Sequence, residues 1–385
     1  MKKHLALVAA LALTAVGTGA FAQDDTVRGG NGVTVGEPVT PVGINVDLRN
    51  LPTAPQWRPG QAIREAQRRV YHPLDAVAPH APADWSTAPD RLGELQEVFD
   101  LSSRSAGDVQ FRSGGRINID NGNTGVSPGD PVVEVGTNHI LYGINSSGGT
   151  TFKVYNKSGT LLSGPTTFKS LAPAGDPCAT SVSDPIILFD RLANRWFMLE
   201  MGGTSSSNRL CTYVSKTSDP VSGGWWFYGF ATPAVPDYPH CGVWNNAYVC
   251  TVNESGTGAK VYVFDRANML NGATARAAQR FTSVAKLSGY GFQALTPASF
   301  MGTTAMPASA APILARHNDD EAHAGTGANT TADFIDLYQL NIDWNTPANS
   351  NIATLPRIQI TEFNSWFRDY SSTTPPTTWL PSPRG

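Results

Sequence analysis

The sequence has few charged residues, no cluster of basic residues and no long apolar segment beyond its first residues. Charged residues make up 15% of the 385 residues, and 28 Lys and Arg stand against 31 Asp and Glu. Nucleic-acid binding depends on clustered Lys and Arg, so we expect no nucleic-acid partner. A membrane helix needs roughly 20 apolar residues, and we expect no membrane span in the mature chain.

The N-terminus has the three parts of a bacterial export signal. Lys2 and Lys3 precede a short apolar run, Leu5–Val16, and Ala20–Ala22 offers small residues to a signal peptidase. The sequence therefore predicts a signal peptide over residues 1–22, cleaved after Ala22. The alternative, a retained anchor helix, requires a longer run. Removing two Lys gives 26 basic residues (28 − 2) and a net charge of −5 (26 − 31), and we expect a secreted or periplasmic protein.

Cysteine is scarce, and its four residues predict two disulfides in an oxidising compartment. Asn245–Asn246 has the character of a two-residue hairpin loop, because Asn tolerates a positive φ. Pairing outward from this loop sets Cys241 opposite Cys250, within disulfide range. Cys178 and Cys211 are then left for each other. The alternative is four free thiols, which exported proteins rarely keep.

The segments at the two ends lack the pattern of the middle. Residues 23–110 are rich in proline and poor in apolar residues, and we interpret them as an extended arm that lies on the domain behind it. A short helix is expected over Gln61–Val70. A small independent domain is the alternative, although few residues are available for its core. Residues 366–385 are expected to form an irregular tail.

The middle of the chain, residues 111–365, is a repeat of strands that begin at proline. Pro131, Pro185, Pro239 and Pro297 are separated by 54, 54 and 58 residues, and proline is tolerated at the first residue of a strand. Three further strands follow in each unit, and the fourth strands are expected at 166–168, 225–228, 279–281 and 358–360. Four-stranded units of this period predict an all-β fold, a β-propeller of antiparallel four-stranded blades with about four blades visible. A β-sandwich is the competing architecture.

Four segments of this repeat resemble a group of large secreted bacterial proteins. The segments are Asp184–Trp196 (DPIILFDRLANRW), Asp237–Pro239, Val261–Arg266 and Asp319–His323, and the resemblance covers roughly residues 115–365. It implies a propeller without an assigned activity, and it brings no catalytic residues. Chains of this group continue further, so the resemblance also implies that this chain is truncated before its last blades.

Three aspartates recur just before the first strands of the units. Asp130, Asp184 and Asp237 are 54 and 53 residues apart. If the first strands line a central channel, these acids converge at its mouth and could perform acid–base chemistry on a glycoside. The structural alternative is that an Asp next to Pro caps local N–H groups in a turn.

One polar loop offers candidate metal ligands, since carboxylate and imidazole suit several divalent ions. Its members are His317, Asp319, Asp320, Glu321 and His323. Structural Ca²⁺ is the ion that its carboxylates would favour, and a solvated acidic loop is the alternative.

An aromatic run in the second unit offers candidate ligand-binding residues. Trp225, Trp226 and Tyr228 lie in a predicted strand whose successive side chains alternate between faces. Exposed rings would stack on a sugar, and buried rings would pack between sheets.

Two functions from different classes follow. The first is an exported binding or scaffold propeller for a carbohydrate or a cell-surface protein. The second is a secreted polysaccharide hydrolase or lyase that uses the aspartates at the channel mouth. The sequence leaves open whether the protein is an enzyme.

Overall fold

The protein is all-β, as predicted. A computed structural model describes residues 32–65 and 119–363, with gaps at 120, 123, 205, 255–257, 286, 288–294, 305 and 320–331. Helix in these residues is confined to α2 (Arg266–Leu270) and the 3₁₀ turns η1 (Leu48–Asn50), η2 (Phe168–Leu171), η3 (Pro177–Ala179) and η4 (Pro347–Asn349). None of the described helices has the length and apolar character needed to cross a membrane.

Four antiparallel sheets follow one another along the chain, and we number them sheets 1 to 4. Sheet 1 contains β5 (Val132–Val135), β6 (His139–Ser146), β7 (Gly149–Asn156) and β8 (Leu161–Thr167). Sheet 2 contains β9 (Ser181–Asp190), β10 (Arg195–Thr204), β11 (Ser207–Ser215) and β12 (Trp225–Ala231). Sheet 3 contains β13 (Asp237–Val243), β14 (Tyr248–Asn253), β15 (Lys260–Phe264) and β16 (Gln279–Phe281). Sheet 4 contains β17 (Thr296–Pro297), β18 (Ile313–Asn318), β19 (Ala332–Asn341), β20 (Asn351–Thr354) and β21 (Ile358–Thr361).

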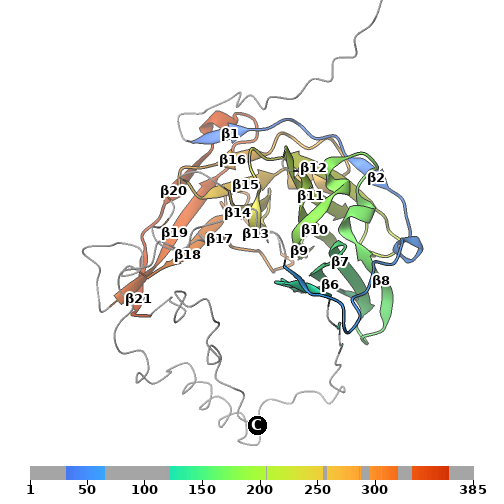
Figure 1. The fold of residues 1–385 in the computed structure, drawn as a ribbon. Coiled ribbons are helices and arrows are strands. Elements are labelled where there is room, and N and C mark those ends of the chain that lie inside the picture. The colour runs from blue at the N-terminus through green and yellow to red at the C-terminus, as the bar shows by residue number, and fades with distance from the viewer. Residues whose placement is uncertain are drawn as a thin grey trace, which may run out of the picture.

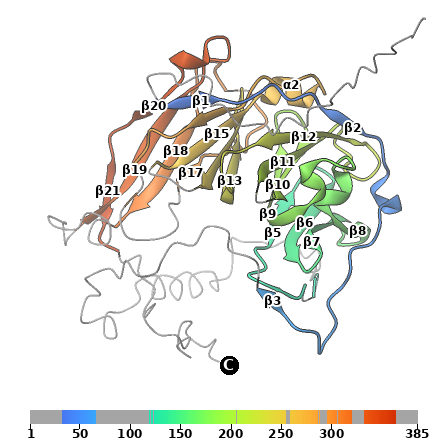
Figure 2. The same ribbon diagram turned by 45° about the horizontal axis from the view of Figure 1, so that its top comes forward.

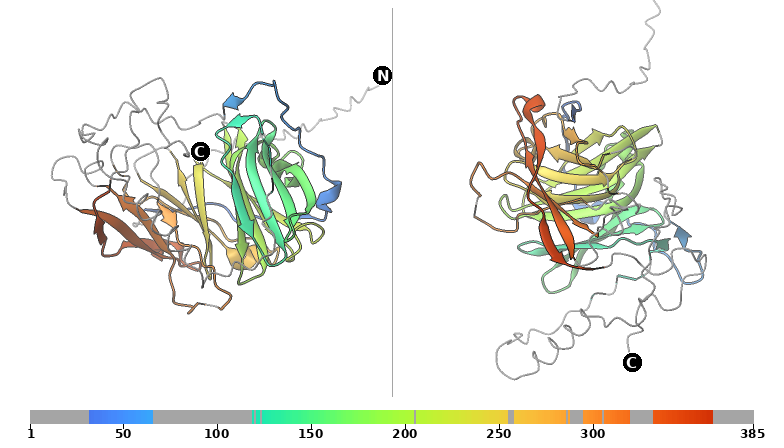
Figure 3. Two further views of the ribbon diagram at one scale, coloured as in Figure 1. Left: turned by 90° about the horizontal axis from the view of Figure 1, so that it is seen from below. Right: turned by 90° about the vertical axis from the view of Figure 1, so that its left-hand side faces the viewer.

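The sheets are arranged in chain order around an arc, with their first strands on its inner side (Figure 1). Neighbouring sheets pack face to face (Figure 3), and the apolar side chains that alternate along their strands form one core between each pair. Phe197 of sheet 2 stacks on Tyr248 of sheet 3 with ring centroids 4.4 Å apart. This packing brings the starts of successive first strands together on the inside of the arc.

The fourth unit departs from the expected strand order. The segment expected as its fourth strand is β21, which pairs with the first half of β19, while β20 pairs with the second half. Two short strands therefore share one long partner. The strand expected to begin at Pro297 is not formed, because Pro297 is the last residue of the two-residue strand β17.

Residues 32–65, which precede sheet 1, run along the outer edges of sheets 2 and 3. β1 (Val33–Val35) pairs with β16 and β2 (Val42–Ile44) pairs with β12, so each adds a fifth strand on the outside (Figure 2). Leu48 lies in the core between sheets 1 and 2 and is 1% exposed. The expected helix is wrong at its start, because β3 (Arg64–Glu65) pairs in parallel with β4 (Val126–Ser127).

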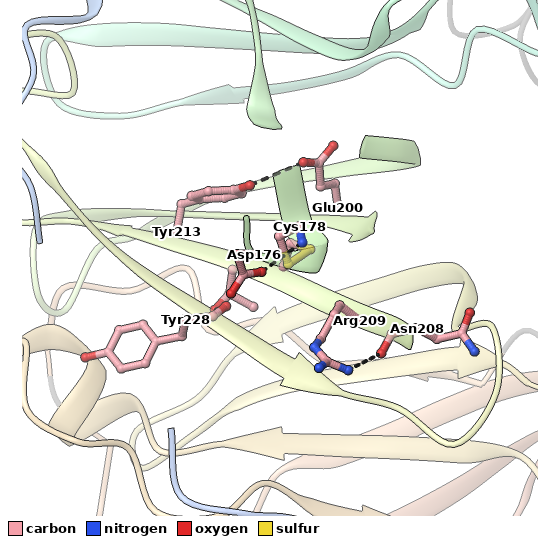
Figure 4. The surroundings of a disulfide bond; sticks show 9 residues. Asp176, Cys178, Glu200, Asn208, Arg209, Tyr213 and Tyr228 are labelled. Carbon is pink, nitrogen blue, oxygen red and sulfur yellow. Dashed lines mark hydrogen bonds between the residues drawn. A yellow bond between two sulfur atoms is a disulfide. The ribbon is translucent and has the colours of Figure 1, made fainter. Parts of the chain in front are cut away.

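Both predicted disulfides are present. Cys241 and Cys250 face each other across β13 and β14 with Cα atoms 4.1 Å apart, in the register counted from the Asn245–Asn246 loop. Cys178 of η3 is bonded to Cys211 of β11. Figure 4 shows Asp176 beside this bond, where its carboxylate accepts the Cys178 N–H at 2.8 Å.

Candidate functional site

Three repeat-equivalent residues on the inner side of the arc have left-handed backbones. They are Asp130 (φ 43°), Asp184 (φ 63°) and Tyr238 (φ 52°), and each directly precedes the proline of its unit. This conformation is rare for residues other than glycine. In sheets 2 and 3 it coincides with a break in strand register, where β9 and β13 bulge away from their partners. The bulge changes the direction of the side chain relative to a regular strand.

A buried amide joins the first two of these positions. Asn145 on β6 is 2% exposed. Its Nδ2 donates to Asp130 Oδ2 at 3.0 Å, and its Oδ1 accepts the backbone N–H of Asp184 at 2.9 Å. Asp184 Oδ2 in turn accepts the backbone N–H of Tyr238 at 3.1 Å. One chain of hydrogen bonds therefore runs from sheet 1 through sheet 2 to sheet 3.

The charges at this site are negative and interact with one another. Desolvation of its carboxyl group, together with the nearby Asp184 carboxylate, raises the pKa of Asp130, and the Asn145 hydrogen bond opposes this rise. Partial burial and the carboxylates of Asp130 and Asp184 raise the pKa of Tyr238. Burial lowers the pKa of His240, against the attraction of Asp184. At neutral pH the site therefore holds a neutral imidazole and a protonated phenol beside the acids.

His240 stands against the third position. Its ring packs edge-on to Tyr238, with centroids 4.5 Å apart and planes at 81°. Its Nε2 is buried and has no hydrogen-bond partner among the described residues. A polar atom of this kind normally has a partner, so it is an exception within this site.

The structure brings two of the three predicted acids together and places another residue at the third position. Asp130 and Asp184 occupy equivalent positions, and their carboxylates accept hydrogen bonds from a neighbouring strand and a neighbouring sheet rather than capping their own turns. Asp237 is half-buried one residue before the equivalent position, in register with Asn253. Tyr238 lies 54 residues after Asp184, the same spacing that separates Asp130 from Asp184, so the repeat identifies Tyr238 as the third equivalent position.

The aromatic candidates belong to the packing between strands and sheets. Trp225 and Tyr228 are fully buried, and their polar atoms donate to Pro220 O at 3.0 Å and Ala273 O at 2.9 Å. Trp226 is half-buried, and the Lys216 ammonium lies over its ring at 3.8 Å. The faces of the two buried rings are closed to a ligand.

The predicted metal loop lies mostly outside the described residues, which end there at Asp319. Asp320, Glu321 and His323 cannot be placed. His317 is exposed on β18 with its ring 5.8 Å from that of Phe363, while Asp319 is buried. No group of three potential metal ligands occurs in the part of the chain that the structure describes. The Ca²⁺ hypothesis stays a prediction.

Comparison with known proteins gives only distant similarities. No protein-family model and no curated protein sequence matches the chain. Among solved structures, an α-L-arabinofuranosidase from Clostridium thermocellum is 16% identical, with 59% of this chain and 72% of that chain covered and a TM-score of 0.34. An α-L-arabinofuranosidase from Podospora anserina, solved with cellotriose, is 10% identical, with 55% and 63% covered and a TM-score of 0.30.

A third solved structure is an engineered GH43 glycoside hydrolase with endo-xylanase and exo-arabinofuranosidase activity. It is 12% identical, 62% of this chain and 42% of that chain are covered, and the TM-score is 0.27. At these TM-scores the similarities assign no activity to this chain, and any function has to be argued from its own site.

Proposed function

We propose that the four sheets are blades of a β-propeller and that the chain is an exported hydrolase acting on a glycan. The observation that carries the proposal is that the buried Asn145 amide binds the Asp130 carboxylate at one end and the Asp184 backbone N–H at the other, which holds the carboxylates of Asp130 and Asp184 near each other. Glycoside hydrolysis uses two carboxyl groups, one of which must be protonated to donate to the leaving oxygen.

The two acids differ in a way that separates their roles. Asp130 is exposed, and the pKa of its carboxyl group is raised by desolvation and by Asp184. It is therefore the proton donor. Asp184 is fixed by the Tyr238 N–H at Oδ2, and its Oδ1 has no hydrogen-bond donor among the described residues. This free oxygen is available to activate a water molecule or to stabilise positive charge on the sugar.

The proposal is tested with purified protein and a panel of aryl glycosides and polysaccharides. Wild type is expected to hydrolyse at least one substrate, and Asp130→Asn and Asp184→Asn to lower kcat by about 100-fold or more. Asp219→Asn is the matched control, because this acid caps a loop after β11, away from the pair. Because Asp130 acts in its protonated form, kcat should fall as the pH rises through its raised pKa. Turnover that survives both substitutions would refute the proposal.

Binding of a glycan without turnover by wild type would favour the other candidate. The inner mouth of the arc would then serve an exported glycan-binding scaffold. The neutral imidazole and phenol beside the acids support polar contacts with sugar hydroxyl groups in either case.

A further inference from the structure

We infer that Tyr238 is the sugar-binding platform of this site and that the ligand is an uncharged glycan. The inference rests on the proposed function for the site's location, and it names the substrate class and the residue that selects it. Three observations carry it: the position of Tyr238, its exposure, and the charge around it.

Tyr238 occupies the position in sheet 3 that the two acids occupy in sheets 1 and 2. Its backbone N–H is held by Asp184 at 3.1 Å, and its left-handed φ of 52° costs free energy that glycine would avoid. A bulky aromatic ring at such a position is not explained by backbone geometry. We therefore assign the ring a role in binding a ligand at this site.

Tyr238 is exposed, whereas the other described Phe, Trp and Tyr residues are buried or half-buried. Tyr238 is 41% exposed and is the only exposed Phe, Trp or Tyr among the described residues. The edge-on contact with His240 fixes its orientation. An ordered, exposed aromatic ring beside polar groups is suited to the apolar face of a sugar.

The charge at the site selects against acidic sugars. The carboxylates of Asp130 and Asp184 both act on the Tyr238 phenol, and Asp184 Oδ2 lies 3.1 Å from the Tyr238 backbone N. A uronate or sulfate group placed here would be repelled by these two carboxylates. An uncharged hexose or pentose polymer meets no such penalty.

The experiment measures binding to the full chain carrying Asp130→Asn, which slows turnover and keeps the Asp184 carboxylate as the source of the repulsion. The probes are neutral pentose and hexose oligosaccharides and oligogalacturonides of equal length. We expect the neutral probe to bind at least about 10-fold more tightly, and the difference to narrow at high ionic strength, because salt screens the repulsion. Equal or tighter binding of the uronide would overturn the inference.

The role of the ring is tested by adding Tyr238→Gly, because glycine adopts a φ of 52° without strain and the variant should fold. Affinity for the neutral probe should fall about 10-fold, the size of a good aromatic contact, and Tyr238→Phe should stay within about threefold. Tyr142→Ala, a half-buried tyrosine on β6, is the control and should bind like its parent. Unchanged affinity in Tyr238→Gly would overturn the inference.

The two proposals fail in different ways. If the neutral glycan binds through Tyr238 but wild type hydrolyses no glycan, the hydrolase is wrong and the platform stands. If wild type hydrolyses a glycan but the loss of the Tyr238 ring changes neither affinity nor KM, the platform is wrong and the hydrolase stands.

Discussion

The substitution Asn145→Asp tests the hydrogen-bonded chain that holds the candidate site together. The change keeps Oδ1, which accepts the Asp184 N–H, but replaces the Nδ2 donor with an oxygen facing Asp130 Oδ2 across 3.0 Å. A favourable hydrogen bond becomes a contact between two carboxylates. Their repulsion is the quantity that the experiment measures.

The magnitude follows from Coulomb's law and from the cost of taking up a proton. Two charges this close repel by about 4–5 kcal/mol at an effective dielectric constant of 20, and by about 1 kcal/mol in water. Asp130 is exposed and Asn145 is buried, so we expect about 2–3 kcal/mol at pH 7. Protonating one carboxyl group removes the repulsion, at a cost of about 1.4 kcal/mol for each pH unit above about 3.9. The penalty is therefore limited to about 1.5 kcal/mol at pH 5.

The sign of the pH dependence is fixed by the pKa. In Asn145→Asp the pair has a raised pKa in the folded state, so the destabilisation is fully present above that raised pKa and disappears below the unfolded value. Denaturant unfolding at pH 7 and pH 5 should show the variant recovering about 0.5–1.5 kcal/mol relative to wild type at the lower pH. Asn50→Asp, at an exposed position on η1, is the control. An equal loss of stability at both pH values would show that the amide does not face Asp130.

Two further predictions concern the packing that carries the site. Leu48→Ala should lower the free energy of unfolding by about 2–4 kcal/mol, because Leu48 is 1% exposed between sheets 1 and 2. The control Val42→Ala, at 43% exposure on the neighbouring strand β2, should lower it by about 0.5 kcal/mol or less. Equal effects would mean that the N-terminal segment does not contribute to this core. Replacing Cys178 and Cys211 by Ala should lower the free energy of unfolding by about 1 kcal/mol more than replacing Cys241 and Cys250 by Ala, because the disulfides close loops of 33 and 9 residues. Denaturant unfolding measures both losses, and a reversed order would contradict the loop-entropy argument.

The sequence allowed the local features of the fold to be predicted, because they depend on short-range chemistry. The Asn245–Asn246 loop and the alternation of its flanking strands were enough to pair Cys241 with Cys250. The prolines located the first strands of sheets 1 to 3 but not all of their starts, because β9 begins at Ser181, before Pro185, and β13 begins at Asp237, before Pro239. The expected helix failed at Arg64–Glu65, because its helical pattern was local whereas β3 is formed by pairing with β4, about 60 residues later.

The candidate site was only half predictable, because it depends on contacts between sheets. Asp130 and Asp184 were found from their spacing, but nothing in the spacing shows that Asn145 lies between them. Tyr238 was not predicted, because it is not an aspartate, although it occupies the same position in the repeat as Asp130 and Asp184. The aromatic run at Trp225 was ambiguous, because alternation along a strand does not show which faces are covered by neighbouring sheets.

The three left-handed positions show why this mouth, and not another surface, is the place to look for function. A glycine at each would adopt the required φ without strain, and the backbone N–H of residue 184 would still donate to Asn145 Oδ1. The Asp184 side chain contributes to folding, because its carboxylate accepts the Tyr238 N–H of sheet 3. The Asp130 carboxylate likewise accepts the buried Asn145 amide, and the Tyr238 ring packs edge-on against His240 although the residue is 41% exposed. Strained residues that three neighbouring sheets place together are typical of sites whose side chains act on a ligand.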